Sequence, residues 1–74
     1  MTPDERLALQ RLADVPRGIT KTLMLAYGFP DELITALVLS GLATVEHEVV
    51  RIGQQKIEVD LVMITDTGRK ALWR

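Results

Sequence analysis

The sequence predicts a small α+β domain, and two observations support that prediction. Residues 2–43 repeat apolar side chains at helical spacing, whereas residues 44–64 are rich in valine and isoleucine and partly alternate with polar residues. The 74 residues suffice for one domain at most. A chain of this length buries only about 60–65% of its unfolded surface. Residues 1–74 are therefore interpreted as a single domain with a thin stability margin.

The segment TPDERLALQRLAD, residues 2–14, opens like a helix. Thr2 is the expected N-cap, Pro3 suits the first helical position, and two acidic residues follow at the positive end of the helix dipole. Pro16 is expected to end this helix, and Gly18 allows the chain to turn.

Two further helices are predicted in the stretch that reads ITKTLMLAYGFPDELITALVLSGLA. The second begins after Thr20, its expected N-cap, and ends at Gly28. The third has Pro30 in its first turn, followed by two acidic residues, and ends at Gly41. The short connection between these helices predicts a helix–turn–helix.

The periodicity then changes from helical spacing to alternation. TVEHEVVRI (44–52) and KIEVDLVMI (56–64) predict two antiparallel strands, joined by GQQ at 53–55. A lone hairpin is marginal in water, so this one must pack against the helices. The last segment, TDTGRKALWR, predicts a terminal turn or short helix capped by Thr65 or Asp66.

The predicted hydrophobic core joins the helices to the hairpin. It contains Leu7, Leu12, Leu23, Leu37, Leu42, Val62 and Ile64. Leu72 and Trp73 are expected to close back onto this core; the alternative is a dimer contact between Trp73 and the first helix. We therefore expect a monomer or a weak homodimer.

The order of these elements resembles a winged helix-turn-helix domain of small bacterial MarR-like and PadR-like transcription regulators. The likeness rests on LITALVLSGLATVE (33–46) and ITDTGRKAL (64–72). The first resembles a recognition helix that runs through a Gly-Leu corner into the wing, and the second resembles the exit from the wing. The resemblance covers nearly the whole chain. It implies three helices, a two-stranded antiparallel wing and a short C-terminal turn or helix.

The resemblance also implies a DNA-binding transcriptional regulator, or a component of one, whose third helix enters the major groove while the hairpin touches the backbone or minor groove. The formal net charge is −1, so binding would be weak and would depend on local basic residues. The candidate DNA contacts are Arg17, Lys21, Thr35, Ser40, Arg51, Gln54, Lys56 and Arg69. For the hairpin tip the alternative is a solvated turn, and for Arg69 we favour a structural salt bridge.

A second hypothesis uses the same fold as a protein-interaction module. Residues 31–50 contain no lysine or arginine, and the third helix begins with two acids that would oppose phosphate. At about 100° per residue, the apolar side chain at position 39 cannot join the centre of the inward face. A partner surface on this helix would contain Glu32, Ala36 and Leu39.

The sequence does not indicate an enzyme. His47 is the only histidine, and Glu46 and Glu48 point to the opposite strand face, so a surface or sheet-packing role is expected. The sequence contains no phosphate loop, HExxH or dinucleotide motif, and we expect no cofactor and no metal. It also contains no cysteine, no membrane-spanning apolar run and no signal-like N-terminus, so we expect a cytoplasmic protein without membrane contact.

Overall fold

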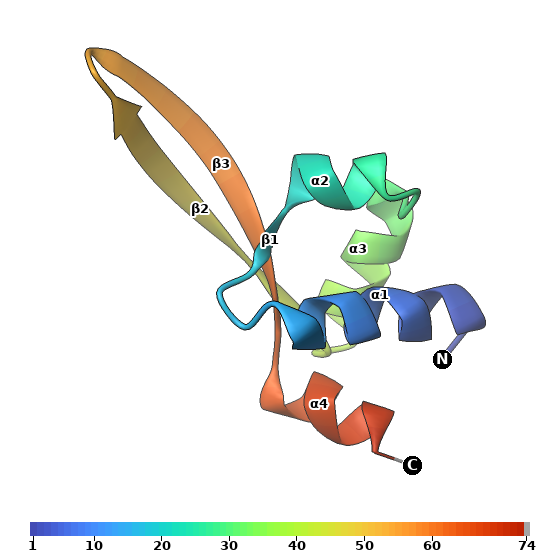
Figure 1. The fold of residues 1–74 in the computed structure, drawn as a ribbon. Helices are drawn as coiled ribbons and strands as arrows, with labels where there is room; N and C mark the ends of the chain where they lie inside the picture. Colours follow the sequence, from blue (N-terminus) through green and yellow to red (C-terminus); the bar gives the residue numbers. More distant parts are fainter. Residues whose placement is uncertain (74) are drawn as a thin grey trace.

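The computed structural model describes residues 1–73, and Arg74 lies outside the described part. These residues form four helices and a three-stranded antiparallel sheet (Figure 1). The three N-terminal helices contact the sheet, and the fourth helix packs against the first. The elements are α1 (Pro3–Asp14), β1 (Ile19–Thr20), α2 (Lys21–Ala26), α3 (Asp31–Leu39), β2 (Ala43–Ile52), β3 (Gln55–Ile64) and α4 (Asp66–Leu72). The predicted α+β class is confirmed.

The first helix begins at a capping box built from two residues. The Oγ1 atom of Thr2 accepts a hydrogen bond from the Glu5 N–H at 3.1 Å, and the Glu5 carboxylate accepts one from the Thr2 N–H at 3.2 Å. These hydrogen bonds to Thr2 lower the pKa of Glu5. The helix ends at Asp14, shortly before Pro16. The predicted N-cap and the predicted end of the helix are therefore confirmed.

The caps of α2 and α3 follow from single residues. The Thr20 hydroxyl accepts a hydrogen bond from the Leu23 N–H at 3.2 Å, which confirms it as the N-cap of α2. Gly28 and Gly41 follow α2 and α3 with φ values of 94° and 75°, a conformation that favours glycine. Pro30 is the N-cap of α3 and makes no side-chain cap bond.

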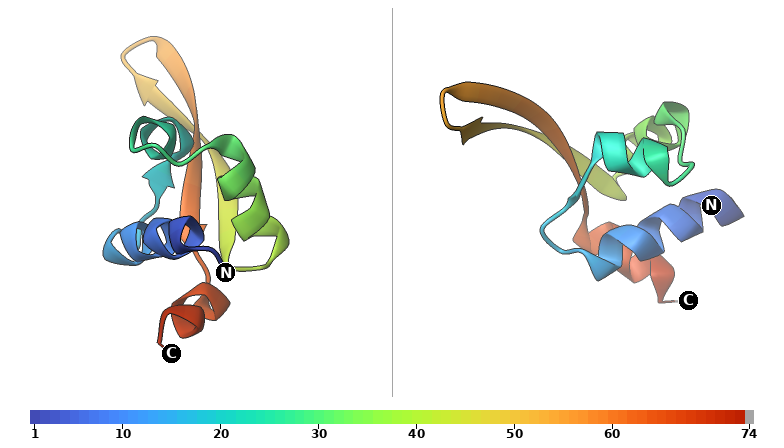
Figure 2. Two further views of the ribbon diagram at one scale, coloured as in Figure 1. Left: turned by 90° about the vertical axis from the view of Figure 1, so that its right-hand side faces the viewer. Right: turned by 45° about the horizontal axis from the view of Figure 1, so that its top comes forward.

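β2 and β3 form a long hairpin that projects beyond the helices (Figures 1 and 2). Their register runs from Ala43 opposite Ile64 to Ile52 opposite Gln55. The loop is therefore two residues long, one fewer than predicted. Its first residue, Gly53, has a φ of 62°, as a type II′ turn requires. The projecting hairpin makes the molecule elongated, with extents of 46 × 22 × 20 Å.

The prediction of a two-stranded sheet is wrong, because β1 adds a third strand in the order β1-β3-β2. Ile19 lies opposite Val62, although the sequence predicts no strand before the second helix. The N-cap backbone of Thr20 is extended, so the chain that enters α2 already has strand geometry. Gly18 permits the close approach of the chain before β1 to β3. Its φ is 101°, and a Cβ atom there would lie 2.7 Å from the Met63 Cγ atom.

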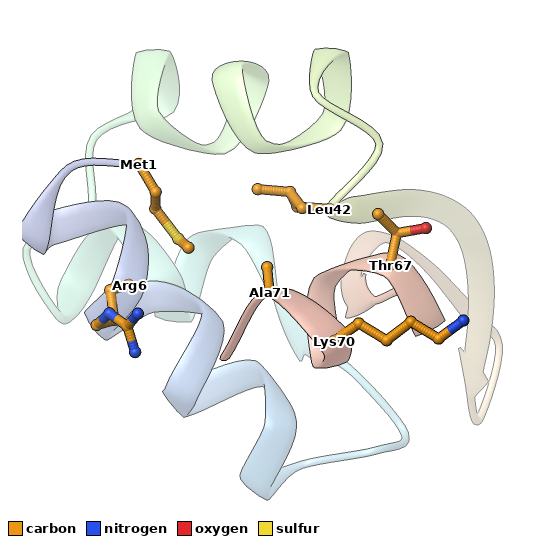
Figure 3. A pocket seen from close by; sticks show the side chains of 6 residues that line it. All are labelled: Met1, Arg6, Leu42, Thr67, Lys70 and Ala71. Carbon is orange, nitrogen blue, oxygen red and sulfur yellow. The ribbon is translucent and has the colours of Figure 1, made fainter. Parts of the chain in front are cut away.

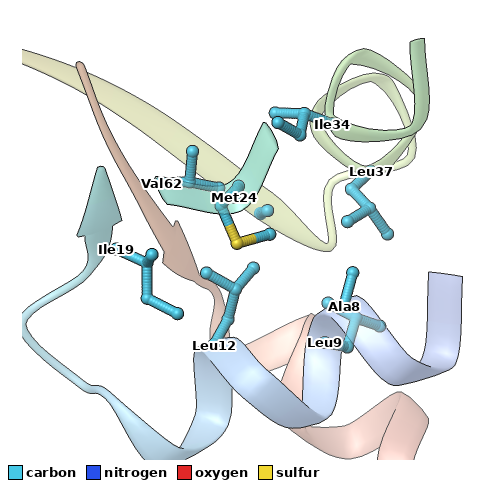
Figure 4. Close-up of a cluster of buried hydrophobic side chains, with 9 residues drawn as sticks. Ala8, Leu9, Leu12, Ile19, Met24, Ile34, Leu37 and Val62 are labelled. Carbon is cyan, nitrogen blue, oxygen red and sulfur yellow. The ribbon is translucent and has the colours of Figure 1, made fainter. Parts of the chain in front are cut away.

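The core lies between the three N-terminal helices and the base of the sheet (Figure 4). Its buried residues are Ala8, Leu9, Leu12, Ile19, Met24, Ile34, Leu37, Ala43 and Val62. Three predicted members, Leu12, Leu37 and Val62, are confirmed. Two more, Leu42 and Ile64, are partly buried and pack against this core.

Two predicted core residues are wrong, because Leu7 and Leu23 are 54% and 43% exposed. Leu7 lies two residues before the buried Leu9, which places it about 200° away around the helix axis. In the short α2 only Met24 is buried. Leu23 lies about 100° from Met24 and so lies at the boundary of the inward face.

α4 is connected to the corner after α3 through Thr65. Its hydroxyl donates to the Gly41 carbonyl oxygen at 2.7 Å and accepts from the Gly68 N–H at 3.0 Å, so Thr65 is the N-cap. Leu72 packs against the core as predicted. The predicted closure of Trp73 is wrong, because this side chain is 87% exposed. The step of about 100° from the inward-facing Leu72 turns it outward.

Candidate interaction surface

The outward face of α3 is acidic and apolar. Glu32, Thr35 and Leu39 lie three or four residues apart, so they share the side of the helix opposite the buried Leu37. Leu39 is 82% exposed. Ala36 is half-buried and offers less surface than predicted. No lysine or arginine lies on this helix, so its outward face lacks groups that would neutralise phosphate.

Lys21 is held by an acidic residue of α3. Its Nζ atom lies 2.6 Å from the Oδ1 atom of Asp31, which joins the first residue of α2 to the first residue of α3. The hydrogen bond to Asp31 is the largest cause of a raised pKa for Lys21, followed by the charge of Asp31. The lysine charge is therefore offset where the sequence predicts a phosphate contact.

The other predicted DNA contacts do not gather on one surface. Arg51 lies opposite Lys56 next to the hairpin turn, which contains Gln54. Arg17 is exposed in the loop before β1. Arg69 lies on α4, at the end of the molecule away from the hairpin turn (Figure 1). The predicted basic contacts are therefore spread over separate parts of the molecule and do not form one continuous positively charged surface.

Thr35 and Ser40 are both exposed, as base contacts would need to be. Thr35 lies in the middle of the outward face of α3, and Ser40 is the C-cap of the helix. Both lie close in sequence to Leu39, whose exposed side chain would approach any groove together with them. Leu39 therefore adds an apolar side chain to the surface around these hydroxyl groups.

The predicted salt bridge of Arg69 is not formed with any acidic side chain of residues 1–73. Within residues 1–73 this side chain forms no ion pair, and it lines a hollow of about 350 Å³ between α1 and α4 with Ala13, Leu72 and Trp73. Arg17, Arg51 and Lys56 likewise form no ion pair with another described residue. Arg17, Arg51 and Lys56 are exposed to solvent, and Arg69 is partly buried.

His47 lies on a face of the hairpin that also carries two carboxylates. Its Nδ1 atom is 2.8 Å from the Asp60 Oδ1 atom, and its Nε2 atom is 3.8 Å from the Glu58 Oε1 atom. The hydrogen bond to Asp60 is the largest cause of a raised pKa for His47, and the charges of both carboxylates add to it. Glu46 and Glu48 lie on the other face, as predicted. His47 is therefore an exposed cross-strand contact.

The side of the hairpin that faces α2 is acidic. A hollow of about 250 Å³ lies there, lined by Thr20, Lys21, Thr22, Leu25, Glu58, Val59 and Asp60. Glu58 and Asp60 belong to the predicted strand 56–64, but the sequence does not place that strand beside α2. The approach of β3 to α2 depends on β1, which leads into α2 and pairs with β3. Because β1 was not predicted, the sequence could not place these two elements together.

A larger hollow of about 440 Å³ lies where the N-terminal part of α1, the corner after α3 and α4 meet (Figure 3). It is lined by Met1, Arg6, Leu42, Thr67, Lys70 and Ala71. In Figure 3 the Lys70 ammonium group lies on the side away from the Arg6 guanidinium group, so the two cations do not converge on one anion. Among residues 1–73, no cluster of three His, Asp or Glu side chains is arranged to hold a metal ion.

None of the helices in residues 1–73 has the length and apolar character needed to cross a membrane. Comparisons of the chain with protein-family models, curated proteins and solved structures found no match.

Proposed function

We propose that this chain is a winged-helix domain that acts as a protein-interaction module, with α3 as its docking surface. The winged-helix assignment is supported by the chain order of three helices, a projecting hairpin and a final short helix. The docking role rests on one observation: Leu39 is 82% exposed on a helix that carries acids in its first turn and no cation. An isolated apolar side chain in this setting suits a protein pocket.

Electrostatics disfavour a base-reading role for α3. Affinity for duplex DNA comes largely from the neutralisation of phosphates by lysine and arginine. Lys21 is already paired with Asp31, and Glu32 adds a second negative charge at the start of α3. The hairpin side facing α2 adds Glu58 and Asp60. A phosphate that approached the start of α3 would therefore meet the carboxylates of Asp31 and Glu32.

The same charges define the chemistry of the partner. We infer a cationic amphipathic segment that places lysine or arginine near Glu32 and an apolar pocket around Leu39. Full burial of a leucine side chain contributes about 1.5–3 kcal/mol, enough to make one residue decisive in a small interface. The partner supplies the cations that this face of the domain lacks.

A binding experiment with a defined probe tests this proposal. The probe is a fluorescently labelled amphipathic helical peptide built from leucine and lysine. It is titrated with the wild-type chain and with the Leu39→Ser variant, which leaves the net charge of the chain unchanged. The matched control is Leu7→Ser, an exposed leucine on α1. We expect Leu39→Ser to weaken binding by about tenfold or more, and Leu7→Ser to leave it within about twofold. Equal effects of the two substitutions would contradict the docking role of α3.

A second candidate function is weak binding of duplex DNA through the hairpin tip. It is supported by Arg51 and Lys56, which form no ion pair with a described residue and flank the turn that contains Gln54. The test is a titration with a mixed duplex at low salt. Binding that is lost in the Arg51→Ala/Lys56→Ala double variant, and that falls steeply with salt, would support this candidate. Binding that survives the double variant would contradict it.

A further inference from the structure

β2 is an edge strand with no neighbour on its outer side among the described residues. In the sheet order β1-β3-β2, β3 is central and β2 bonds only to β3. Of the ten residues of β2 only Ala43 is buried, and Figures 1 and 2 show the turn end of the hairpin projecting beyond the helices. An exposed strand edge presents unpaired backbone N–H and C=O groups that can pair with another strand.

The hairpin turn determines which backbone groups face outward. A two-residue turn is closed by a pair that exchanges both hydrogen bonds, here Ile52 and Gln55. Because the bonding alternates along an antiparallel strand, Val50 also bonds to β3. Val49 and Arg51 then direct their N–H and C=O groups to the open edge.

The side chains along this edge are self-complementary. On one face the exposed Arg51 and Lys56 lie opposite one another, and the next pair toward the helices is Val49 and Glu58. The hairpin therefore has a basic end and an acidic stem on the same face. If two copies of this edge pair antiparallel, the basic end of each meets the acidic stem of the other.

We propose that a second copy of this chain docks on β2, with antiparallel pairing of residues 48–52 about a two-fold axis at Val50. In this register Val49 of one copy lies opposite Arg51 of the other, and both present their hydrogen-bonding groups to the interface. The Arg51 side chain then extends toward Glu58 of the second copy.

The opposite face of the same pairing is apolar at its centre. Val50 meets Val50 of the second copy, and each is flanked by the exposed Ile57 of its own β3. Glu48 lies opposite Ile52 of the second copy, so the two Glu48 carboxylates do not face each other. Acidic residues on an edge strand normally discourage pairing, and this register separates them.

The resulting dimer is weak and independent of the proposed function. A five-residue pairing is smaller than the roughly 1,200 Å² at which stable interfaces begin, so we expect a dissociation constant of about 0.1–1 mM. The surface on β2 does not include the outward face of α3, so loss of partner binding at Leu39 would not affect this dimer.

Sedimentation of the full chain between about 20 µM and 1 mM at low salt tests the dimer. Val49→Pro removes an outward N–H without removing a hydrogen bond of the hairpin. Val45→Pro is the matched control, because the backbone N–H of Val45 also points away from β3 but lies outside the pairing segment, residues 48–52. We expect Val49→Pro to weaken association by about tenfold or more, and Val45→Pro to leave it nearly unchanged.

A charge exchange provides a second readout if a proline variant fails to fold. Arg51→Glu and Glu58→Arg should each weaken the dimer by about three- to tenfold, and the double exchange should restore it. A wild-type chain that stays monomeric at 1 mM would overturn the proposal. A dimer that Val49→Pro does not weaken, or single charge variants that the double exchange fails to rescue, would overturn it equally.

Discussion

Gly68 is the position at which a single methyl group should have the clearest effect on stability. A Cβ atom there would overlap the Leu42 carbonyl oxygen and lie 2.8 Å from the Ile64 Cγ1 atom. The Leu42 oxygen also accepts the Thr65 N–H at 3.1 Å, so it cannot move without loss of that bond. Gly68→Ala would therefore push α4 away from the corner after α3.

The magnitude follows from two opposing effects. Alanine in place of glycine favours a helix by about 1 kcal/mol, whereas forcing an extra carbon into a packed contact costs typically about 1–3 kcal/mol. Because the overlapped atom is backbone, the upper part of that range applies. We expect Gly68→Ala to reduce the free energy of unfolding by about 1–2 kcal/mol, which lowers the Tm by about 4–15 °C in a chain of this size.

Circular dichroism at 222 nm during urea and thermal unfolding measures this change. The matched control is Thr67→Ala, an exposed neighbouring position on α4, which should stay within about 0.5 kcal/mol of the wild type. If Gly68→Ala proves as stable as the wild type or more stable, the close packing of α4 against the Leu42 carbonyl would be refuted.

Three further predictions concern the core, a cap and the hairpin. Leu37→Ala should lower the free energy of unfolding in urea by about 2–5 kcal/mol, because Leu37 is buried. Leu39→Ala should change it by less than about 0.5 kcal/mol, because Leu39 is exposed. Similar losses from the two substitutions would contradict this difference in burial. Thr20→Ala should cost about 1 kcal/mol by removal of the N-cap of α2; an unchanged midpoint would argue against that cap. By NMR titration the pKa of His47 should lie above 6.5, and Asp60→Asn should lower it. Because the folded pKa is raised, the stabilisation is complete below pH 6.5 and is lost as the pH rises through the folded pKa; a wild-type stability profile parallel to that of Asp60→Asn would contradict this.

The features that the sequence predicted correctly are local ones. Thr2 and Thr20 act on N–H groups three residues away, and Gly28 and Gly41 adopt backbone conformations that favour glycine. The alternation of apolar and polar residues identified both strands of the hairpin. Each of these signals lies within a few residues of its effect, so one sequence is enough to detect it.

The features that were missed depend on residues distant in the chain. β1 is two residues long and exists only because it meets β3 about 40 residues later. The pairing of Lys21 with Asp31 depends on how α2 and α3 pack, and no spacing rule predicts it. The exposure of Leu7 depends on which side of α1 meets the sheet. The sequence thus predicted which residues of α3 belong to the candidate surface. The pairing of Lys21 with Asp31, which offsets a positive charge beside that surface, is known only from the fold.

We propose that α3 docks a protein and does not read bases, and an NMR titration with DNA tests this most directly. The amide signals of the ¹⁵N-labelled chain are recorded during titration with a mixed DNA duplex at low salt. Our account predicts that signals of residues 31–40 stay in place, and that any shifts are confined to residues 51–56. Progressive shifts centred on residues 31–40 would contradict it, because they would place α3 against the duplex despite its carboxylates.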